Sequence, residues 1–176
     1  MPNINISKYQ MNNVEVNKSI RLSQHFTLGE MTRTGTGIPN IPSRVIIENL
    51  RNICENWLEE MRYDYNTLYC LKPGEDYETS KSVEPVIITS GFRSEDVNRA
   101  VGGSPTSNHL SGCAVDIRCA GFEQAVRYAT ILLDIADDTK QDYDELFIER
   151  KKGGRYWLHF AVRPEDNRRK NGFINA

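Results

Sequence analysis

Ten residues in the second half of the chain, from Ser107 to Asp116, constrain the fold most strongly. They hold His109, Gly112 and Asp116 at fixed spacing, and another histidine, His159, follows far downstream; the chain has only three histidines. Two histidines and one carboxylate are a sufficient protein ligand set for a catalytic zinc ion, with the fourth position open for water. If these residues share a metal ion, the fold must bring residue 159 back to the 107–116 segment.

The spacing by itself leaves two interpretations open. Gly112 gives the chain room to turn, so the side chains of His109 and Asp116 can point at one place, as metal ligands do. Alternatively, this histidine and this aspartate form a hydrogen-bonded pair on the surface. In the first case an open metal position would lower the pKa of a bound water to about 7.

Length and composition indicate a single globular domain. The chain has 176 residues, of which 39% are hydrophobic and 26% charged, which are ordinary values for a globular protein that buries one core. A net charge of −2 gives no electrostatic case for binding nucleic acid. No apolar run is long enough to span a membrane, so we expect no membrane insertion.

The N-terminus and the cysteines suggest a cellular location. The first residues lack the basic and apolar regions of a signal peptide, so we expect a cytoplasmic location in the producing cell. Reduced, mostly buried cysteines are expected there. The four are Cys54, Cys70, Cys113 and Cys119.

The first firm helix signal lies at residues 26–31. Thr27 and Glu30 have the spacing of a capping box, and Phe26 and Met31 occupy the two positions of a hydrophobic staple. His25, just before this helix start, is expected to be structural or exposed rather than a ligand.

A longer helix is predicted from Ser43 to Arg62, with its apolar residues facing the core. Residues 1–20 are interpreted as a polar N-terminal arm, and residues 63–84 as a long loop or insertion that could help to shape a cleft. The apolar stripe of the helix has the three- and four-residue steps of an amphipathic helix. It comprises Ile46, Leu50, Ile53, Cys54, Trp57, Leu58 and Met61.

The second half of the chain predicts a sheet with two further helices. Strands are predicted at 86–89, 113–118, 146–149 and 156–162, and helices at 95–100 and 122–136. The predicted fold class is therefore α+β, with helices packed on one face of a mostly antiparallel sheet. We expect one domain over residues 21–163, followed by a polar C-terminal tail at 164–176.

Three segments resemble the peptidase M15 family. Residues 107–116, read as Ser-x-His-x-x-Gly-x-Ala-x-Asp, resemble its S-x-H-x-x-G-x-A-x-D signature. Residues 89–94 (Thr-Ser-Gly-Phe-Arg-Ser) resemble the strand and arginine that precede the signature, and residues 157–159 (Trp-Leu-His) resemble its W-x-H segment. Residues 25–28 resemble the opening of the M15_3 subfamily, so that the resemblance covers about residues 22–162.

The family comprises zinc D-Ala-D-Ala carboxypeptidases and dipeptidases, together with related phage endolysins that cut peptidoglycan stem peptides. The Hedgehog N-terminal domain shares the same metal scaffold. The resemblance therefore implies a zinc peptidase that hydrolyses peptidoglycan stem peptides with a metal-activated water, at D-Ala-D-Ala or at L-Ala-D-Glu. The alternative is a catalytically inactive, zinc-containing protein that binds the cell wall or has a structural role in a phage.

The resemblance also implies roles for individual residues. Arg93 matches the arginine that binds the scissile carbonyl and stabilises the oxyanion in the family's dipeptidases; alternatively, it forms an ion pair with Glu95 or Asp96. Ser107 is expected to support its loop or to bind substrate. The implied ligands of a single zinc ion are His109, Asp116 and His159.

One departure from the family pattern concerns the general base. Many members have an acid three residues before the last histidine, whereas this chain has Tyr156, which cannot act as a carboxylate base. The nearest acids, Asp144, Glu145 and Glu149, lie on the preceding segment. We predict Glu149 as the catalytic acid/base, with Asp144 as the alternative.

The choice of Glu149 depends on the register of the predicted hairpin. With a five-residue turn at 151–155, Glu149 pairs with Trp157 and lies on the same face as His159. With a four-residue turn it would face away from the site. The two glycines at 153–154 favour the longer, bulged turn.

The absence of a signal peptide bears on how such an enzyme would reach its substrate. Phage endolysins leave the producing cell through lesions made by holins, so we expect a phage or prophage origin and action on the wall after release by that route. Peptidoglycan peptides are the expected partners, and the protein is expected to be a monomer.

Overall fold

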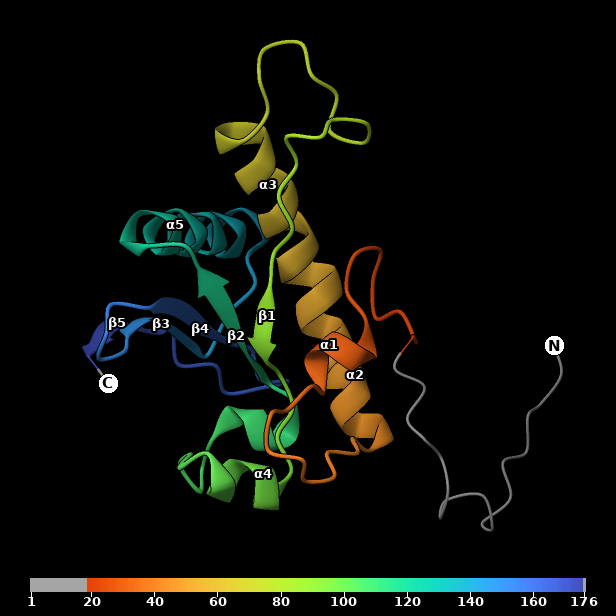
Figure 1. Cartoon of the computed structure of the whole chain (residues 1–176), viewed down its shortest axis with the longest axis vertical. Coiled ribbons are helices and arrows are strands. Elements are labelled where there is room, and N and C mark those ends of the chain that lie inside the picture. Colours follow the sequence, from red (N-terminus) through yellow and green to blue (C-terminus); the bar gives the residue numbers. More distant parts are fainter. Residues whose placement is uncertain (1–18, 176) are drawn as a thin grey trace, which may run out of the picture.

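The sheet and its strand order establish the architecture. The structure is a computed structural model and describes residues 19–175, so most of the predicted arm at 1–20 lies outside the described residues (Figure 1). The sheet has five strands in the order β1-β2-β4-β3-β5, all neighbours antiparallel except the parallel pair β3 and β5. The predicted single-domain α+β class is confirmed. The strands are β1 (Ile88–Ser90), β2 (Ala114–Cys119), β3 (Glu145–Arg150), β4 (Tyr156–Ala161) and β5 (Lys170–Asn175).

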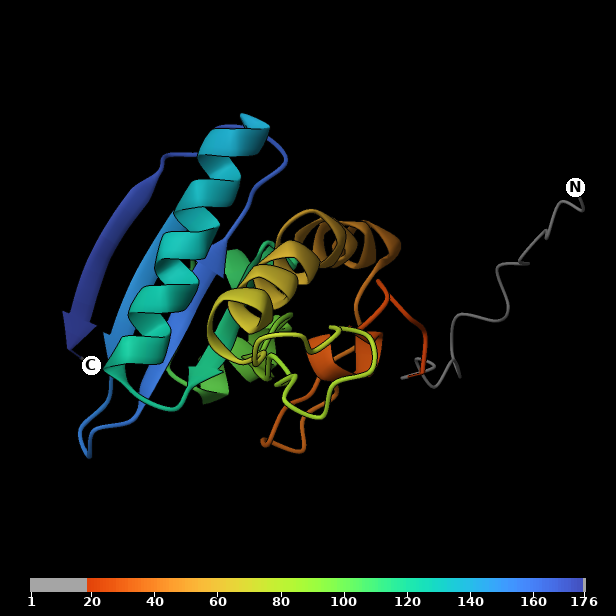
Figure 2. The ribbon, with the colours of Figure 1, turned by 90° about the horizontal axis from the view of Figure 1, so that it is seen from above.

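The long helices cover one face of this sheet. Helix α5 lies along the strands and the helix formed by α2 and α3 lies beside it (Figure 2). Within residues 19–175, no helix is long and apolar enough to cross a bilayer. The α-helices are α1 (Leu28–Met31), α2 (Arg44–Ile53), α3 (Glu59–Tyr69), α4 (Glu95–Ala100) and α5 (Phe122–Thr139); η1 (Cys54–Leu58) is a π-helical turn, and η2 (Asn108–Ser111) is a 3₁₀ turn.

The two predicted helix starts are confirmed by their caps. Thr27 accepts a hydrogen bond from the backbone N–H of Glu30, and the Glu30 carboxylate accepts one from the Thr27 N–H, which is the reciprocal capping box. Ser43 caps α2 by accepting from the backbone N–H of Ile46.

The helix that begins after Ser43 continues to Tyr69 rather than ending at Arg62. It passes through the π-helical turn η1, and its last part is held by tertiary contacts. The ring of Tyr65 packs against Tyr128 of α5 with 4.6 Å between centroids, and the side chain of Asn66 bonds both the N–H and the C=O of Glu84. Residues 63–69 therefore lie in α3, and the loop starts only at residue 70.

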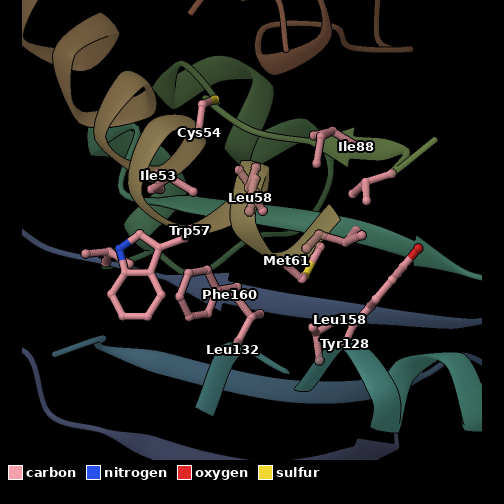
Figure 3. Close-up of a cluster of buried hydrophobic side chains, with 14 of the residues drawn as sticks. Ile53, Cys54, Trp57, Leu58, Met61, Ile88, Tyr128, Leu132, Leu158 and Phe160 are labelled. Carbon is pink, nitrogen blue, oxygen red and sulfur yellow. The ribbon is translucent and has the colours of Figure 1, made fainter. Parts of the chain in front are cut away.

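The hydrophobic core lies between these helices and the sheet. Trp57 packs on Phe160 of β4 with 5.1 Å between ring centroids (Figure 3), so the apolar stripe of the long helix faces the strands as predicted. Both side chains are fully buried. The stripe residues Leu50, Ile53, Cys54, Trp57, Leu58 and Met61 are all inaccessible to solvent.

The β3–β4 hairpin has the longer of the two turns considered. Strand β3 ends at Arg150 and β4 begins at Tyr156, so residues 151–155 form the turn and Glu149 pairs with Trp157, as predicted. Gly153 and Gly154 have φ angles of 101° and 82°, a region that favours glycine. Since Phe147 pairs with His159, Glu149 and His159 lie on the same face of the sheet, opposite the helices.

The C-terminal segment, expected as a polar tail at 164–176, includes a strand. Strand β5 pairs in parallel with β3 along its whole length, while its side chains stay exposed. The sequence of β5 offers only two apolar residues, so backbone hydrogen bonds rather than burial hold it at the edge. Asn171 also accepts a hydrogen bond from the Tyr143 hydroxyl at 2.6 Å.

We expect Gly112→Ala to destabilise the fold by about 2–4 kcal/mol, because it combines a strained backbone with overpacking. Gly112 ends η2 with a φ of 68°, and a Cβ there would lie 2.7 Å from Ile46 Cγ2 and 2.9 Å from the Ile46 carbonyl oxygen. Gly102→Ala is the matched control, since its φ is 73° but its Cβ would meet nothing within 4 Å. Urea denaturation should show a loss of about 1 kcal/mol for the control; equal losses would contradict the close approach.

Candidate metal centre

Two strands and one turn bring the predicted ligands together. Asp116 lies in the middle of β2 and pairs directly with His159 of β4, so both side chains leave the same face of the sheet. His109 lies in η2, where the Ser107 hydroxyl accepts a hydrogen bond from the His109 backbone N–H. The left-handed backbone of Gly112 ends η2 and turns the chain into β2.

The three side chains converge through specific atoms. Asp116 Oδ1 lies 3.2 Å from His109 Nε2 and 2.9 Å from His159 Nδ1. One ligand atom from each residue falls within 4.8 Å of the other two. Two imidazole nitrogens and a carboxylate oxygen are donors that zinc accepts, and three protein ligands leave a position open. The residues present therefore fit a catalytic zinc ion.

The other nitrogen of each imidazole has a partner that orients the ring. His109 Nδ1 lies 2.6 Å from the carbonyl oxygen of Gly91, and His159 Nε2 lies 3.5 Å from Glu145 Oε2. Such outer contacts fix the tautomer and the orientation of metal-binding histidines. They leave His109 Nε2 and His159 Nδ1 facing the centre. The sequence placed Glu145 near the site but indicated no role for it.

The centre strongly perturbs its own titratable groups. Burial alone would raise the pKa of Asp116, but the two imidazoles beside it outweigh burial and hold its pKa far below the ordinary value. Burial disfavours the charged form of His159, yet its hydrogen bonds to Asp116 and Glu145 raise its pKa to about 9. Without a metal ion, the carboxylate is therefore ionised and His159 is protonated at neutral pH.

Arg93 belongs to this centre. Its Nη2 lies 2.5 Å from Asp116 Oδ2, and its Nε donates to the Ser90 hydroxyl at 2.8 Å. The alternative ion pair with Glu95 or Asp96 is absent among the residues described. Arg93 thus holds the second oxygen of Asp116, which leaves Oδ1 directed at the two histidines.

Glu149 lies on the same face of the sheet as His159. It is half-buried and forms no side-chain hydrogen bond or ion pair within the described part of the chain. Burial raises its pKa, and the charges of Asp116 and Glu145 add to that effect while His159 and Arg93 oppose it. These electrostatic couplings agree with the register that puts Glu149 on the face of the metal centre.

Asp144, the alternative acid, is fully enclosed by other side chains. It is inaccessible to solvent and accepts hydrogen bonds from Arg168 Nε at 2.7 Å and from Asn108 Nδ2 at 2.8 Å. Burial opposes its ionisation, but these donors and the charge of Arg163 lower its pKa. Both oxygens of Asp144 are therefore engaged, whereas the Glu149 carboxylate has no such partner among residues 19–175.

The remaining histidine and the cysteines lie outside the cluster. His25 Nδ1 contacts the Glu59 carboxylate of α3 at 2.6 Å, which agrees with the structural role expected for it. All four cysteines are free thiols. The potential metal-binding group found in residues 19–175 consists of His109, Asp116 and His159.

We expect zinc binding to release about one proton at pH 7, because His159 must lose its proton to present Nδ1 to a metal ion. Since the metal-free pKa is about 9, the apparent affinity should rise by up to about tenfold per unit between about pH 6 and 8. Calorimetry in buffers with different ionisation enthalpies measures the released protons. His25→Ala should behave like wild type, and an affinity independent of pH would contradict the prediction.

Comparison with known proteins agrees with this geometry. The family model described as Peptidase M15 matches residues 75–137, a stretch that contains Arg93, His109 and Asp116. His159 lies beyond the match, and the structure itself brings it to the other ligands. No curated protein matches the chain. Residues 75–137 of the chain are thus similar to the peptidase M15 family, whose members are zinc-dependent.

Proposed function

We propose that this protein is a zinc peptidase that hydrolyses peptidoglycan stem peptides, either at D-Ala-D-Ala or at L-Ala-D-Glu. The observation that carries the proposal is the convergence of His109 Nε2, His159 Nδ1 and Asp116 Oδ1. Such a ligand set is that of a catalytic rather than a structural zinc site, because structural sites are closed by four protein ligands.

Zinc held by these residues would supply a Lewis acid and lower the pKa of water at the site. Glu149 would then take a proton from the attacking water and deliver it to the leaving amine. Its carboxylate has no competing partner among the described residues. Diagonal neighbours on adjacent strands lie about 7–8 Å apart at their Cα atoms, which puts Glu149 within side-chain reach of the region beside His159.

Arg93 would act on the carbonyl oxygen. Its Nε and Nη2 are held by Ser90 and Asp116, whereas Nη1 has no partner within residues 19–175. A fixed guanidinium next to a carbonyl stabilises the negative charge that develops there as water attacks. Because Ser90 and Asp116 already fix the orientation of the group, little reorganisation is needed during the reaction.

A non-catalytic, wall-binding protein that keeps the zinc is the second candidate, because Tyr156 stands where many family members have an acid. The strand geometry weakens this candidate. Residues three apart on a strand point to opposite faces, and the Tyr156 ring lies 5.7 Å from that of Phe122 on α5. An acid at position 156 would therefore face away from His159, so its absence does not remove a catalytic group from this site.

The test is mass spectrometry of defined muropeptides after incubation with the zinc-loaded protein, with His109→Ala as the control. We expect cleavage products only with the wild-type protein, and their masses identify the bond. Intact substrates after incubation with folded, zinc-containing protein would instead support the wall-binding candidate.

Glu149→Gln should lower kcat by about 10²–10⁴-fold, since the amide cannot transfer the proton. Zinc affinity should stay within about threefold of wild type, because Glu149 is not among the converging ligands. Glu165→Gln, an exposed acid beyond β4, is the matched control. Hydrolysis at the wild-type rate by Glu149→Gln would remove this residue from the mechanism.

A further inference from the structure

A cleft of about 400 Å³ adjoins the metal centre at the end of the sheet where the β3–β4 turn lies. Asp116 forms its border with the centre, Trp157 contributes aromatic surface, and Tyr156 also lines it. Three cationic residues also line it: Arg118 from β2, and Lys151 and Arg155 from the turn.

The three cations of the cleft make no polar side-chain contact in the part of the chain that the structure describes. Within residues 19–175, none of their side chains forms an ion pair or a hydrogen bond. The one acid that lines the cleft is Asp116, which already bonds two imidazoles and Arg93. The cleft therefore presents uncompensated positive charge beside the centre, which suits an anionic ligand.

The distance between the metal centre and Arg118 indicates how far from the scissile bond of a bound peptide the anionic group would lie. Arg118 follows Asp116 by two positions in β2, so its Cα lies about 7 Å farther along the same face. An extended peptide advances by about the same length over two residues. A substrate whose scissile carbonyl lies at the metal centre would thus bring a group one or two residues away over these cations.

We propose that this cleft binds a carboxylate of the substrate peptide, one or two residues from the scissile bond. The inference rests on the proposed peptidase function and adds the residues, Arg118, Lys151 and Arg155, that would recognise a carboxylate next to that bond. Guanidinium and ammonium groups form charge-assisted hydrogen bonds with carboxylates, and the Trp157 side chain supplies apolar surface for the adjoining carbon atoms. Peptides with a carboxamide in place of the carboxylate should bind less well.

The experiment compares two peptides that differ only in a free carboxylate or a carboxamide on the residue next to the scissile bond. Their binding to the zinc-loaded protein is measured by calorimetry, and their hydrolysis by KM and kcat. The variant is Lys151→Gln with Arg155→Gln; both side chains are exposed in the turn, so the fold should be retained. Lys152→Gln is the matched control, because Lys152 lies in the same turn but does not line the cleft.

We expect the wild-type protein and the Lys152→Gln control to bind the carboxylate peptide about tenfold more tightly than the carboxamide, and the double variant to lose this preference. The preference should also shrink when salt rises from about 0.05 to about 0.5 M. Equal affinities in wild type, no binding of either peptide, or a preference retained by the double variant would overturn the proposal. Binding with the expected preference but without cleavage would instead refute the peptidase function and leave the cleft assignment standing.

Discussion

The Asp116 carboxylate is the group on which the arrangement of the site depends. It is 8% exposed, and a buried charge is tolerated only when it is paired. Its partners come from three other parts of the fold: His109 in η2, His159 in β4 and Arg93 after β1. The same contacts that satisfy the carboxylate therefore dock the turn and both neighbouring strands around the metal position. Loss of Asp116 would leave two imidazoles and a guanidinium close together without a counter-charge.

The register of β3 against β4 places Glu149 on the same face of the sheet as His159. Because side chains alternate along a strand, a one-residue slip of β3 against β4 would move Glu149 to the helix-covered face. The five-residue turn with two left-handed glycines prevents that slip. The same register puts Glu145 next to His159. One turn thus determines that both Glu149 and Glu145 lie on the same face of the sheet as His159.

The sequence was most informative where short-range rules act. Spacing and resemblance found His109, Asp116 and His159, and the Thr27–Glu30 box and the hairpin glycines correctly predicted a helix start and a register. Features set by distant contacts were missed. Helix α3 continues because Tyr65 meets Tyr128, β5 forms by backbone pairing with β3, and Asp144 is enclosed by Arg168 and Asn108. None of these pairings is encoded by a local pattern in the chain.

The open face of the sheet differs in charge between its two ends. At one end, Arg168 bonds both Asp144 and Glu145, and Asn108 links the same two carboxylates. This network leaves no charge free and supports His159 through Glu145. At the other end, Arg118, Lys151 and Arg155 line a cleft and have no acidic partners among residues 19–175. Exposed ion pairs add little to the stability of a fold. The protein can therefore leave these three cations unpaired at little cost in stability. If a peptide lies across the centre as proposed, its carboxylate would meet the cations at one end, while Glu145 at the other end holds His159 in place.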